Sequence, residues 1–362
     1  MKIIDLSNRM NMFYWQTNRQ LSAKETKEIF MNRYGQIDNA TIRRIVEYGM
    51  ANAGFTGKDI EVKHLKSTIK QGSVNTVIPV ELESGQIIVL RIHPKRVKNG
   101  YFWVEKIATS LAKKEGVPTY STIFIDDTQA KFPFDFMIMS CVSGRPMQEL
   151  NPLNPKLEKK LVTDTGKYTA LIHKIQTVDF GFYDNKKAKD DQMLLGQYKF
   201  FKEHIYAGFY EDLKFLVENQ ILTRNQRKTV ETIFSKNEDL INIKRGFLIH
   251  NDIADWNELS DGKSITGIMD WDECFSGDPL MELSAYSLFF GEPRITWFKQ
   301  GYNQVGTLEN NEDKFQLFKL RYLISKMHLR KKRSLIDNSP IIRRNIQRGM
   351  EAMREVFKFF KL

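Results

Sequence analysis

The stretch that decides the fold is Phe247–Asp272, FLIHNDIADWNELSDGKSITGIMDWD, in which short apolar runs alternate with polar turns. Its first run leads into a polar loop that begins at Asn251, and its last run, 265–269, ends at Asp270. The residues 260–263, Ser-Asp-Gly-Lys, have the composition of a tight turn between strands. We therefore expect a strand, a polar loop, a second strand, a turn and a third strand, with the polar ends facing one pocket.

Four polar side chains stand at these ends. His250, Asp252 and Asn257 lie on the expected loop, and Asp270 follows the last strand. Transfer of a phosphoryl group to an alcohol needs a carboxylate that receives the alcohol proton, and a carboxamide with a second carboxylate to hold Mg²⁺. This set therefore favours phosphoryl transfer over the alternative, a loop of Asx turns with a solvated acidic face.

The run His250-x-Asp252-x4-Asn257, followed by Ile-Met-Asp-Trp-Asp at 268–272, resembles the catalytic signature of aminoglycoside phosphotransferases and related small-molecule kinases. The resemblance implies an α+β class and a two-lobed protein-kinase-like fold, with a small antiparallel-sheet N-lobe and a larger, mainly helical C-lobe. It also implies that Asp252 is the catalytic base and that Asn257 and Asp270 are magnesium ligands. His250 in such enzymes mainly braces the loop.

A nucleotide lobe is then expected upstream. Its strands are predicted at 65–69, 75–82 and 86–92 from runs of strand formers. The link 71–75, Gln-Gly-Ser-Val-Asn, would cover phosphates with backbone N–H groups and the Ser73 hydroxyl. An ordinary hairpin loop is the alternative for this link.

Arg91 ends the third strand, where protein kinases place a lysine that holds phosphates. A guanidinium can bind phosphate with two parallel hydrogen bonds, so the role is open to arginine. Hygromycin-type enzymes carry a similar Val-Leu-Arg run. The helix expected over 101–115 then places Glu105 where the family offers a carboxylate to this cation. The alternatives are a surface arginine on an edge strand and a solvated helix charge.

The apolar run 136–139 and the residues after it resemble the hinge between the lobes, so the backbone near Ser140 and Val142 would meet the adenine edge. A capping box predicts a helix from Ser22 to Tyr34, and apolar spacing predicts another over 39–53. The chain is thus expected to divide into a helical N-terminal extension, a nucleotide-binding N-lobe, and a helical C-lobe with the catalytic loop and acceptor site. Their bounds are 1–59, 60–139 and 140–362.

Composition agrees with a cytoplasmic enzyme. At 362 residues and 41% hydrophobic, the chain is long enough to bury two cores. Two cysteines in such a length give no disulfide framework, which indicates a reducing compartment. The N-terminus lacks the apolar centre of a signal peptide, and no apolar run approaches a membrane span, so no membrane partner is expected.

Charge is distributed unevenly along the chain. The net charge is +11, and residues 321–362 hold 12 Lys or Arg against 3 Asp or Glu. These basic residues alternate with apolar ones, as on the solvated face of amphipathic helices, so a nucleic-acid partner is not favoured. Residues 250–283 instead hold 9 acidic residues against a single lysine. The surplus acids would attract an amine-bearing acceptor; they are Asp255, Asp272, Glu273, Asp278 and Glu282. For Asp278 and Glu282 the alternative is that they cap and brace the following helix.

The sequence therefore predicts a kinase that transfers the γ-phosphoryl group of ATP or GTP, with Mg²⁺, to a hydroxyl of an aminoglycoside-like, cationic acceptor. A metabolite alcohol (a sugar, choline or homoserine) is the alternative acceptor, and a catalytically silent nucleotide-binding module is the alternative class. A protein kinase is disfavoured because only 11 residues separate Asp270 from Glu282, without an Ala-Pro-Glu landmark. ATP versus GTP and the oligomeric state are left open.

Overall fold

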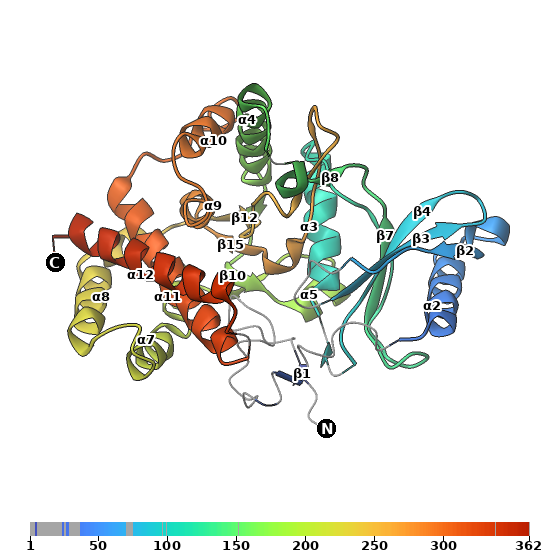
Figure 1. Cartoon of the computed structure of the whole chain (residues 1–362), viewed down its shortest axis with the longest axis horizontal. Helices are drawn as coiled ribbons and strands as arrows, with labels where there is room; N and C mark the ends of the chain where they lie inside the picture. Colours follow the sequence, from blue (N-terminus) through green and yellow to red (C-terminus); the bar gives the residue numbers. More distant parts are fainter. Residues whose placement is uncertain are drawn as a thin grey trace.

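The computed structural model describes residues 37–69, 75–95, 97–98, 100–150, 152–336 and 338–361, together with residues 4–5, 24, 27 and 28. An antiparallel sheet with one helix against it lies at one end of the molecule, and most of the helices gather at the other end (Figure 1). This is the two-lobed α+β arrangement that the sequence predicted.

The N-lobe is built on a five-stranded antiparallel sheet with β4 in its centre. Its strands, in spatial order, are β2 (Val62–Leu65), β3 (Thr76–Leu82), β4 (Ile87–Ile92), β7 (Phe136–Ser140) and β6 (Thr122–Asp126). The helix α2 (Asn39–Asn52) shares one hydrophobic core with this sheet, because Ile45, Val46 and Met50 are fully buried along its inner face. The apolar spacing of α2 therefore places one face of it against the sheet.

The strand predicted over 65–69 was wrong in its position. The observed strand is Val62–Leu65, and beyond it Ile69 forms only an isolated bridge to Val77. Burial explains the difference, since Val62 enters the core while Ile69 is 41% exposed. The phosphate link with Ser73 lies outside the described residues, as does the predicted helix 22–34 except for helical positions 24, 27 and 28.

The helix α3 (Phe102–Lys114) follows the sheet and matches the predicted helix 101–115 closely. It buries Phe102, Val104 and Ala108, and it also buries Glu105. The short strand β5 (Val97–Lys98) before it pairs in parallel with β1 (Ile4–Asp5).

Two small sheets support the helices of the C-lobe. One has the order β11 (Gly196–Tyr198), β10 (Phe180–Tyr183), β15 (Phe275–Gly277), β12 (Gly246–Ile249) and β9 (Gln176–Thr177), and the other has the order β14 (Ile265–Ile268), β13 (Glu258–Ser260) and β8 (Arg145–Pro146). The strands β12, β13 and β14 confirm the strand, loop, strand, turn and strand expected over 246–269. The catalytic loop is thus held between two sheets.

Helices make up most of the C-lobe. They are α4 (Pro155–Ile172), α5 (Asn185–Asp190), α6 (Phe201–Tyr206), α7 (Phe209–Glu218), α8 (Arg224–Lys236), α9 (Pro279–Tyr286), α10 (Arg294–Tyr302), α11 (Glu312–Ser334) and α12 (Pro340–Phe359). Short 3₁₀ turns lie at Gly57–Asp59, Met147–Leu150, Glu238–Ile241 and Trp271–Glu273. In the part of the chain that the structure describes, no helix combines the length and apolarity that crossing a bilayer requires.

The last two helices, α11 and α12, pack side by side across the front of the C-lobe (Figure 1). They are in close contact at Gly349, where a Cβ atom would lie 2.2 Å from the Met327 sulfur. The long run Leu317–His328 of α11 is largely buried, which explains why its basic residues do not form a free surface. The predicted pair of helices is confirmed, but only α12 is amphipathic with an exposed polar face.

Candidate active site

The catalytic loop lies between β12 and β13 and is fixed by a buried carboxylate. Glu282 of α9 accepts hydrogen bonds from the backbone N–H groups of His250, at 2.7 Å, and Asn251, at 2.9 Å. The His250 ring lies 3.0 Å from the Met269 carbonyl, and burial lowers its pKa. A neutral histidine held in this way braces the loop, as the sequence predicted, rather than exchanging protons.

Asn251 allows the loop to turn. Its φ is +73°, in the left-handed region that asparagine tolerates better than most residues. Its side chain donates to the Glu273 carbonyl at 3.2 Å and accepts the Tyr322 hydroxyl at 2.6 Å. The catalytic loop is therefore bonded directly to α11, which carries Tyr322.

Asp252 and Asn257 meet on this loop. The Asn257 amide Nδ2 donates to the Asp252 carboxylate oxygen Oδ2 at 2.7 Å and to the Asp252 carbonyl at 2.9 Å. The Trp256 indole also donates to the same Oδ2, at 3.3 Å. These bonds orient the Asp252 carboxylate through one oxygen and leave the other, Oδ1, available to accept the proton of a hydroxyl.

Asp270 follows β14 and is brought beside Asn257. The Met269 N–H donates to the Asn257 carbonyl at 2.8 Å, which joins the two segments directly. Asp270 has a φ of +64° and a ψ of +66°, an uncommon left-handed conformation for a residue other than glycine. This conformation ends the strand and turns the chain at the site, where its side chain is 46% exposed.

Arg91 links Asp270 to the N-lobe. Its guanidinium lies 2.5 Å from the Glu105 carboxylate and 3.4 Å from that of Asp270. The Tyr120 hydroxyl donates to the same Glu105 carboxylate at 2.5 Å. Since β4 is the central strand and Arg91 is 5% exposed, the alternative of a surface arginine on an edge strand is wrong.

The charges of this cluster are strongly coupled. Burial alone would lower the pKa of Arg91, but Glu105, then Tyr120 and Asp270, outweigh it and raise that pKa. The pKa of Asp270 is raised by the surrounding protein atoms and by the neighbouring Asp272 carboxylate, against the effect of Arg91. Asp270 is flanked by protein and still reached by solvent, so a cation could enter and compensate this crowding of carboxylates.

The predicted hinge lies beside β14. Ser140 ends β7 and pairs with Ile88, and its side-chain oxygen accepts the Ser121 N–H at 2.9 Å. Val142 packs near Gly267 of β14, where a Cβ atom would lie 2.6 Å from the Val142 methyl group Cγ1. Val142 therefore lies against the strand that leads to Asp270, whereas Ser140 is held by the N-lobe sheet.

Three of the five surplus acids of residues 250–283 are engaged within the protein. Asp255 pairs with Arg294 at 2.5 Å, and Asp278 caps α9 and pairs with Lys314 at 2.5 Å. Glu282 joins α9 to the catalytic loop, as shown above. The expectation that Asp278 caps the helix is confirmed, and these three acids are not free for an acceptor.

A cavity of about 350 Å³ adjoins the catalytic loop. Its lining residues come from the loop, from the end of α9 and from α11 and α12; they are Trp256, Leu288, Phe289, Phe290, Leu323, Arg330, Asn345, Arg348, Gly349 and Ala352. We refer to it as the Trp256 cavity. Asp252 itself does not line this cavity, but the Trp256 indole that does line it donates to the Asp252 carboxylate.

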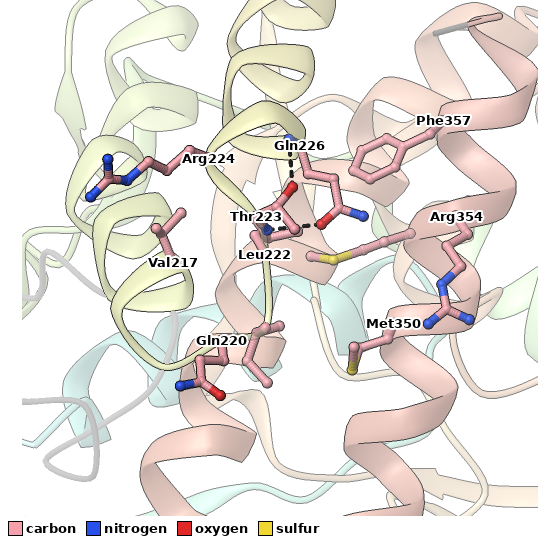
Figure 2. Close-up of a pocket in the computed structure, with 11 residues that line it drawn as sticks. Val217, Gln220, Leu222, Thr223, Arg224, Gln226, Met350, Arg354 and Phe357 are labelled. Carbon is pink, nitrogen blue, oxygen red and sulfur yellow. Dashed lines mark hydrogen bonds between the residues drawn. The ribbon is translucent and has the colours of Figure 1, made fainter.

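Another cavity, of about 520 Å³, lies farther from the loop, between α8 and α12. Figure 2 shows Thr223 and Gln226, joined by reciprocal hydrogen bonds at the start of α8, on one side, and Met350 and Phe357 of α12 on the other. None of the residues that line it belongs to the catalytic loop, so its larger volume does not make it the reaction site.

Sequence reasoning missed three groups that the structure brings to the site. Tyr120 binds Glu105, Trp256 binds Asp252, and Arg294 neutralises Asp255. Only Trp256 left a local signal, as an aromatic residue one position before Asn257 in the loop. Tyr120 and Arg294 are distant in sequence from their partners, so no spacing pattern could have revealed them.

The fold and this constellation define a kinase-like phosphotransferase with an alcohol acceptor. A sequence model of the phosphotransferase enzyme family (APH) matches residues 67–317, and the chain belongs to that family. No curated protein matches the chain significantly.

Solved structures share the fold at low identity. A thermostable mutant of the aminoglycoside phosphotransferase APH(4)-Ia, in a ternary complex with AMP-PNP and hygromycin B, is 17% identical; the match covers 82% of this chain and 94% of that chain, with a TM-score of 0.60. A putative aminoglycoside phosphotransferase from Ralstonia eutropha JMP134 is 15% identical, covering 90% and 98%, with a TM-score of 0.60. A putative fructosamine-3-kinase from Thermobifida fusca is 17% identical, covering 85% and 99%, with a TM-score of 0.57.

Proposed function

We propose that this protein is a small-molecule kinase that transfers the γ-phosphoryl group of ATP or GTP to a hydroxyl, with Asp252 as the catalytic base. The observation that carries the proposal is the backbone bond of 2.8 Å between Met269 N and the Asn257 carbonyl. It joins the loop that presents Asp252 to the strand end that presents Asp270. A general base and two oxygen ligands for a cation are thereby gathered at one place.

The residues present fit Mg²⁺. The Asn257 amide gives its N–H to Asp252, so its oxygen is the atom left for a cation, and the Asp270 carboxylate is accessible. Mg²⁺ is often held by one or two side chains while phosphates and water complete its shell. We propose Asn257 and Asp270 as its ligands, and when bound the ion would neutralise charge on the phosphates.

The proposed nucleotide site lies on the N-lobe side of this centre. Arg91, held by Glu105, would bind phosphates, and the backbone at Ser140 and Val142 would meet the base. We include the Ser73 loop from its position in the sequence. The division into regions 1–59, 60–139 and 140–362 belongs to the same proposal. Within it, the helix α2 of the first region packs into the core of the N-lobe sheet. Relatives have been solved with AMP-PNP and with GDP, which supports a nucleotide but leaves ATP and GTP as equal candidates.

Two acceptor classes are supported by different observations. The structural neighbours favour the aminoglycoside-like antibiotic, since one of them is bound to hygromycin B. The charge of the site favours the metabolite alcohol, because Asp255 and Asp278 are already paired with Arg294 and Lys314. A cationic acceptor would compete with these internal ion pairs. We also propose a cytoplasmic location, consistent with the free cysteines Cys141 and Cys274.

The test is nucleotide turnover by wild type and by Asp252→Asn, with magnesium, against hygromycin B, neomycin, glucose, glucuronate, choline and homoserine. Removing the base should lower kcat by about 10²–10⁴-fold with unchanged nucleotide affinity. Asp261→Asn is the matched control, an exposed carboxylate in the β13–β14 turn. If Asp252→Asn kept kcat within threefold, Asp252 would not be the base. Nucleotide binding without turnover for any alcohol would favour a silent binding module.

A further inference from the structure

The charged residues that line the Trp256 cavity are both basic. Arg330 comes from α11 and Arg348 from α12, and among the described residues that line the cavity there is no aspartate or glutamate. This contrasts with the acidic composition of the neighbouring loop. The contrast arises because the acids of the loop are turned inward to Arg294, Lys314 and backbone N–H groups, as described above.

Arg330 is partly buried and differs in its partners from Lys314 and Arg294 of the C-lobe. Lys314 pairs with Asp278 at 2.5 Å, and Arg294 pairs with Asp255 at 2.5 Å. The Arg330 guanidinium instead donates to a neutral carbonyl, that of Asn345, at 3.0 Å. Burial lowers its pKa, and within the described chain no carboxylate forms an ion pair with it. A partly desolvated cation without an anion is costly, and a bound anion would offset that cost.

Aromatic side chains form the wall nearest the base. The Trp256 and Phe289 rings are 4.8 Å apart and nearly perpendicular, at 88°. The Lys326 ammonium lies 4.9 Å from the Phe289 ring centre, and the Arg294 guanidinium lies 4.0 Å from that of Phe290. Such rings offer flat apolar surface to a ring-shaped ligand.

The cavity and the base share structural elements. The Trp256 indole donates to the Asp252 carboxylate at 3.3 Å, and α11 is bonded to the catalytic loop through Tyr322 and Asn251 at 2.6 Å. A volume of about 350 Å³ is near the lower end of the range for small-molecule sites, roughly 300–1,000 Å³. It suits a ligand of one or two rings, with a hydroxyl directed past Trp256 to Asp252.

We infer that the acceptor is a ring-bearing alcohol that carries an anionic group, a carboxylate, sulfate or phosphate, bound by Arg330 and Arg348. This inference rests on the proposed function and names the substrate class of the same site. The acceptor oxygen forms a bond to the γ-phosphorus while the bond from phosphorus to the β–γ bridging oxygen breaks. The hydroxyl proton passes to Asp252, and the nucleoside diphosphate leaves with the electron pair of the broken bond.

Three matched probes test the charge preference: phenyl β-D-glucoside, phenyl β-D-glucosaminide and phenyl β-D-glucuronide. They share a sugar ring and a phenyl group and differ in being neutral, cationic or anionic. Their binding is measured by calorimetry in the presence of AMP-PNP and magnesium. The glucuronide should bind about tenfold more tightly than the glucoside, the gain expected from one charge-assisted hydrogen bond, and the glucosaminide should bind most weakly.

Variants assign the preference to the two arginines. Arg348→Gln, at an exposed position whose replacement leaves folding intact, and Arg330→Gln should each reduce the preference to about threefold or less. Arg344→Gln, another exposed arginine of α12 outside the cavity lining, should keep it. Equal binding of the three probes, undetectable binding of all three, tightest binding of the glucosaminide, or an unchanged preference in both variants would each overturn the inference.

The same probes separate this inference from the proposed function. Asp252→Asn should lose phosphoryl transfer and still bind the glucuronide most tightly, because the arginines remain. Retained preference for the anion in a protein that transfers phosphate to no alcohol would reject the kinase assignment and keep the anionic ligand. Transfer that favours neutral or cationic alcohols would keep the kinase and reject the anionic acceptor.

Discussion

Two partly or fully buried arginines stand on opposite sides of the site and differ in their partners. On the N-lobe side, Arg91 contacts the carboxylates of Glu105 and Asp270, which raise its pKa against the effect of burial. On the C-lobe side, Arg330 contacts the Asn345 carbonyl, and burial lowers its pKa. The protein itself thus neutralises Arg91, whereas it gives Arg330 no carboxylate partner in the described chain.

This difference teaches what each arginine can do for the reaction. Arg91 is held in position before any ligand arrives, which suits a group that must stabilise charge at a defined point. Arg330 gains most from a ligand that brings its own negative charge, which suits selection of an acceptor. Substitutions that remove these charges should therefore differ in size of effect, with a large loss of stability at Arg91 and a small change at Arg330.

The largest effect is expected for Arg91→Met. It leaves Glu105 buried without its cation, so the free energy of unfolding should fall by about 3–5 kcal/mol. The loss of a positioned charge should also lower kcat/KM for the nucleotide by about 10²–10³-fold. Urea denaturation and steady-state kinetics measure the two effects.

Lys63→Met is the matched control, because Lys63 pairs with Glu81 at 2.8 Å on the exposed edge of the same sheet. Its free energy of unfolding should change by less than about 1 kcal/mol. If Arg91→Met and Lys63→Met were equally stable, burial of the Arg91–Glu105 pair would not matter for the fold.

The next test uses Glu258, a second buried carboxylate. Unlike Glu105, it has no cation in direct contact with it among the residues that the structure describes. Burial raises the pKa of Glu258 from 4.5 to about 8, and the Thr165 hydroxyl donates to it at 2.6 Å. Between these pKa values the folded protein keeps a proton that the unfolded chain has lost. Stability should therefore fall as pH rises, by about 2–3 kcal/mol from pH 6 to pH 8.

Glu258→Gln should remove this slope, and the variant should exceed wild type in stability at pH 8. Urea denaturation at a series of pH values measures it, with Glu61→Gln, at an exposed position, as the control that keeps the wild-type slope. Parallel pH profiles for wild type and Glu258→Gln would mean that Glu258 is ionised in the folded protein.

A smaller effect is expected for Tyr120→Phe. The change removes the hydroxyl that donates to Glu105 at 2.5 Å but leaves Arg91 in place. One hydrogen bond to a charged group contributes about 1.5–3 kcal/mol, and the free energy of unfolding should fall by that amount. Tyr168→Phe, at a half-buried tyrosine of α4, should change it by less than about 0.5 kcal/mol. Equal losses in the two variants would show that Tyr120 does not support the Arg91–Glu105 pair.

The smallest effect on stability is expected for Arg330→Met. An apolar residue replaces a cation that has no anionic partner in the described chain, so the change should stay within about 1 kcal/mol in either direction. Arg321→Met on the same helix is the contrast, because Arg321 donates to the Ala207 carbonyl at 2.8 Å and lies 3.8 Å from Asp212. The free energy of unfolding should fall several times more for Arg321→Met than for Arg330→Met. A loss as large for Arg330→Met would mean that Arg330 serves the fold rather than a ligand.

The pattern of the catalytic segment was sufficient to predict its strands, because short apolar runs and turn formers act locally. The strand at 86–92 and the helix at 101–115 also followed from local patterns, and the pairing of Arg91 with Glu105 followed from their resemblance to the family. The position of the first strand could not be predicted from such local patterns. Val62 and Ile69 are both β-branched apolar residues, and only burial in the core shared with α2 distinguishes them.

The electrostatics of the site were the least predictable part. The acidic excess of residues 250–283 suggested an open negative surface, but Arg294 and Lys314 neutralise Asp255 and Asp278 from helices later in the chain. The Trp256 cavity likewise depends on α11 and α12, whose basic residues appeared as a solvated face. Long-range contacts of this kind leave no periodic signal in a single sequence.

The shape of the Trp256 cavity depends on the absence of a side chain at Gly349. The residue lines the cavity and also packs closely against Met327 of α11. A methyl group there would displace the Met327 side chain and change the spacing of the two helices. A single substitution at Gly349 would thus change the shape of the cavity without altering any residue of the catalytic loop.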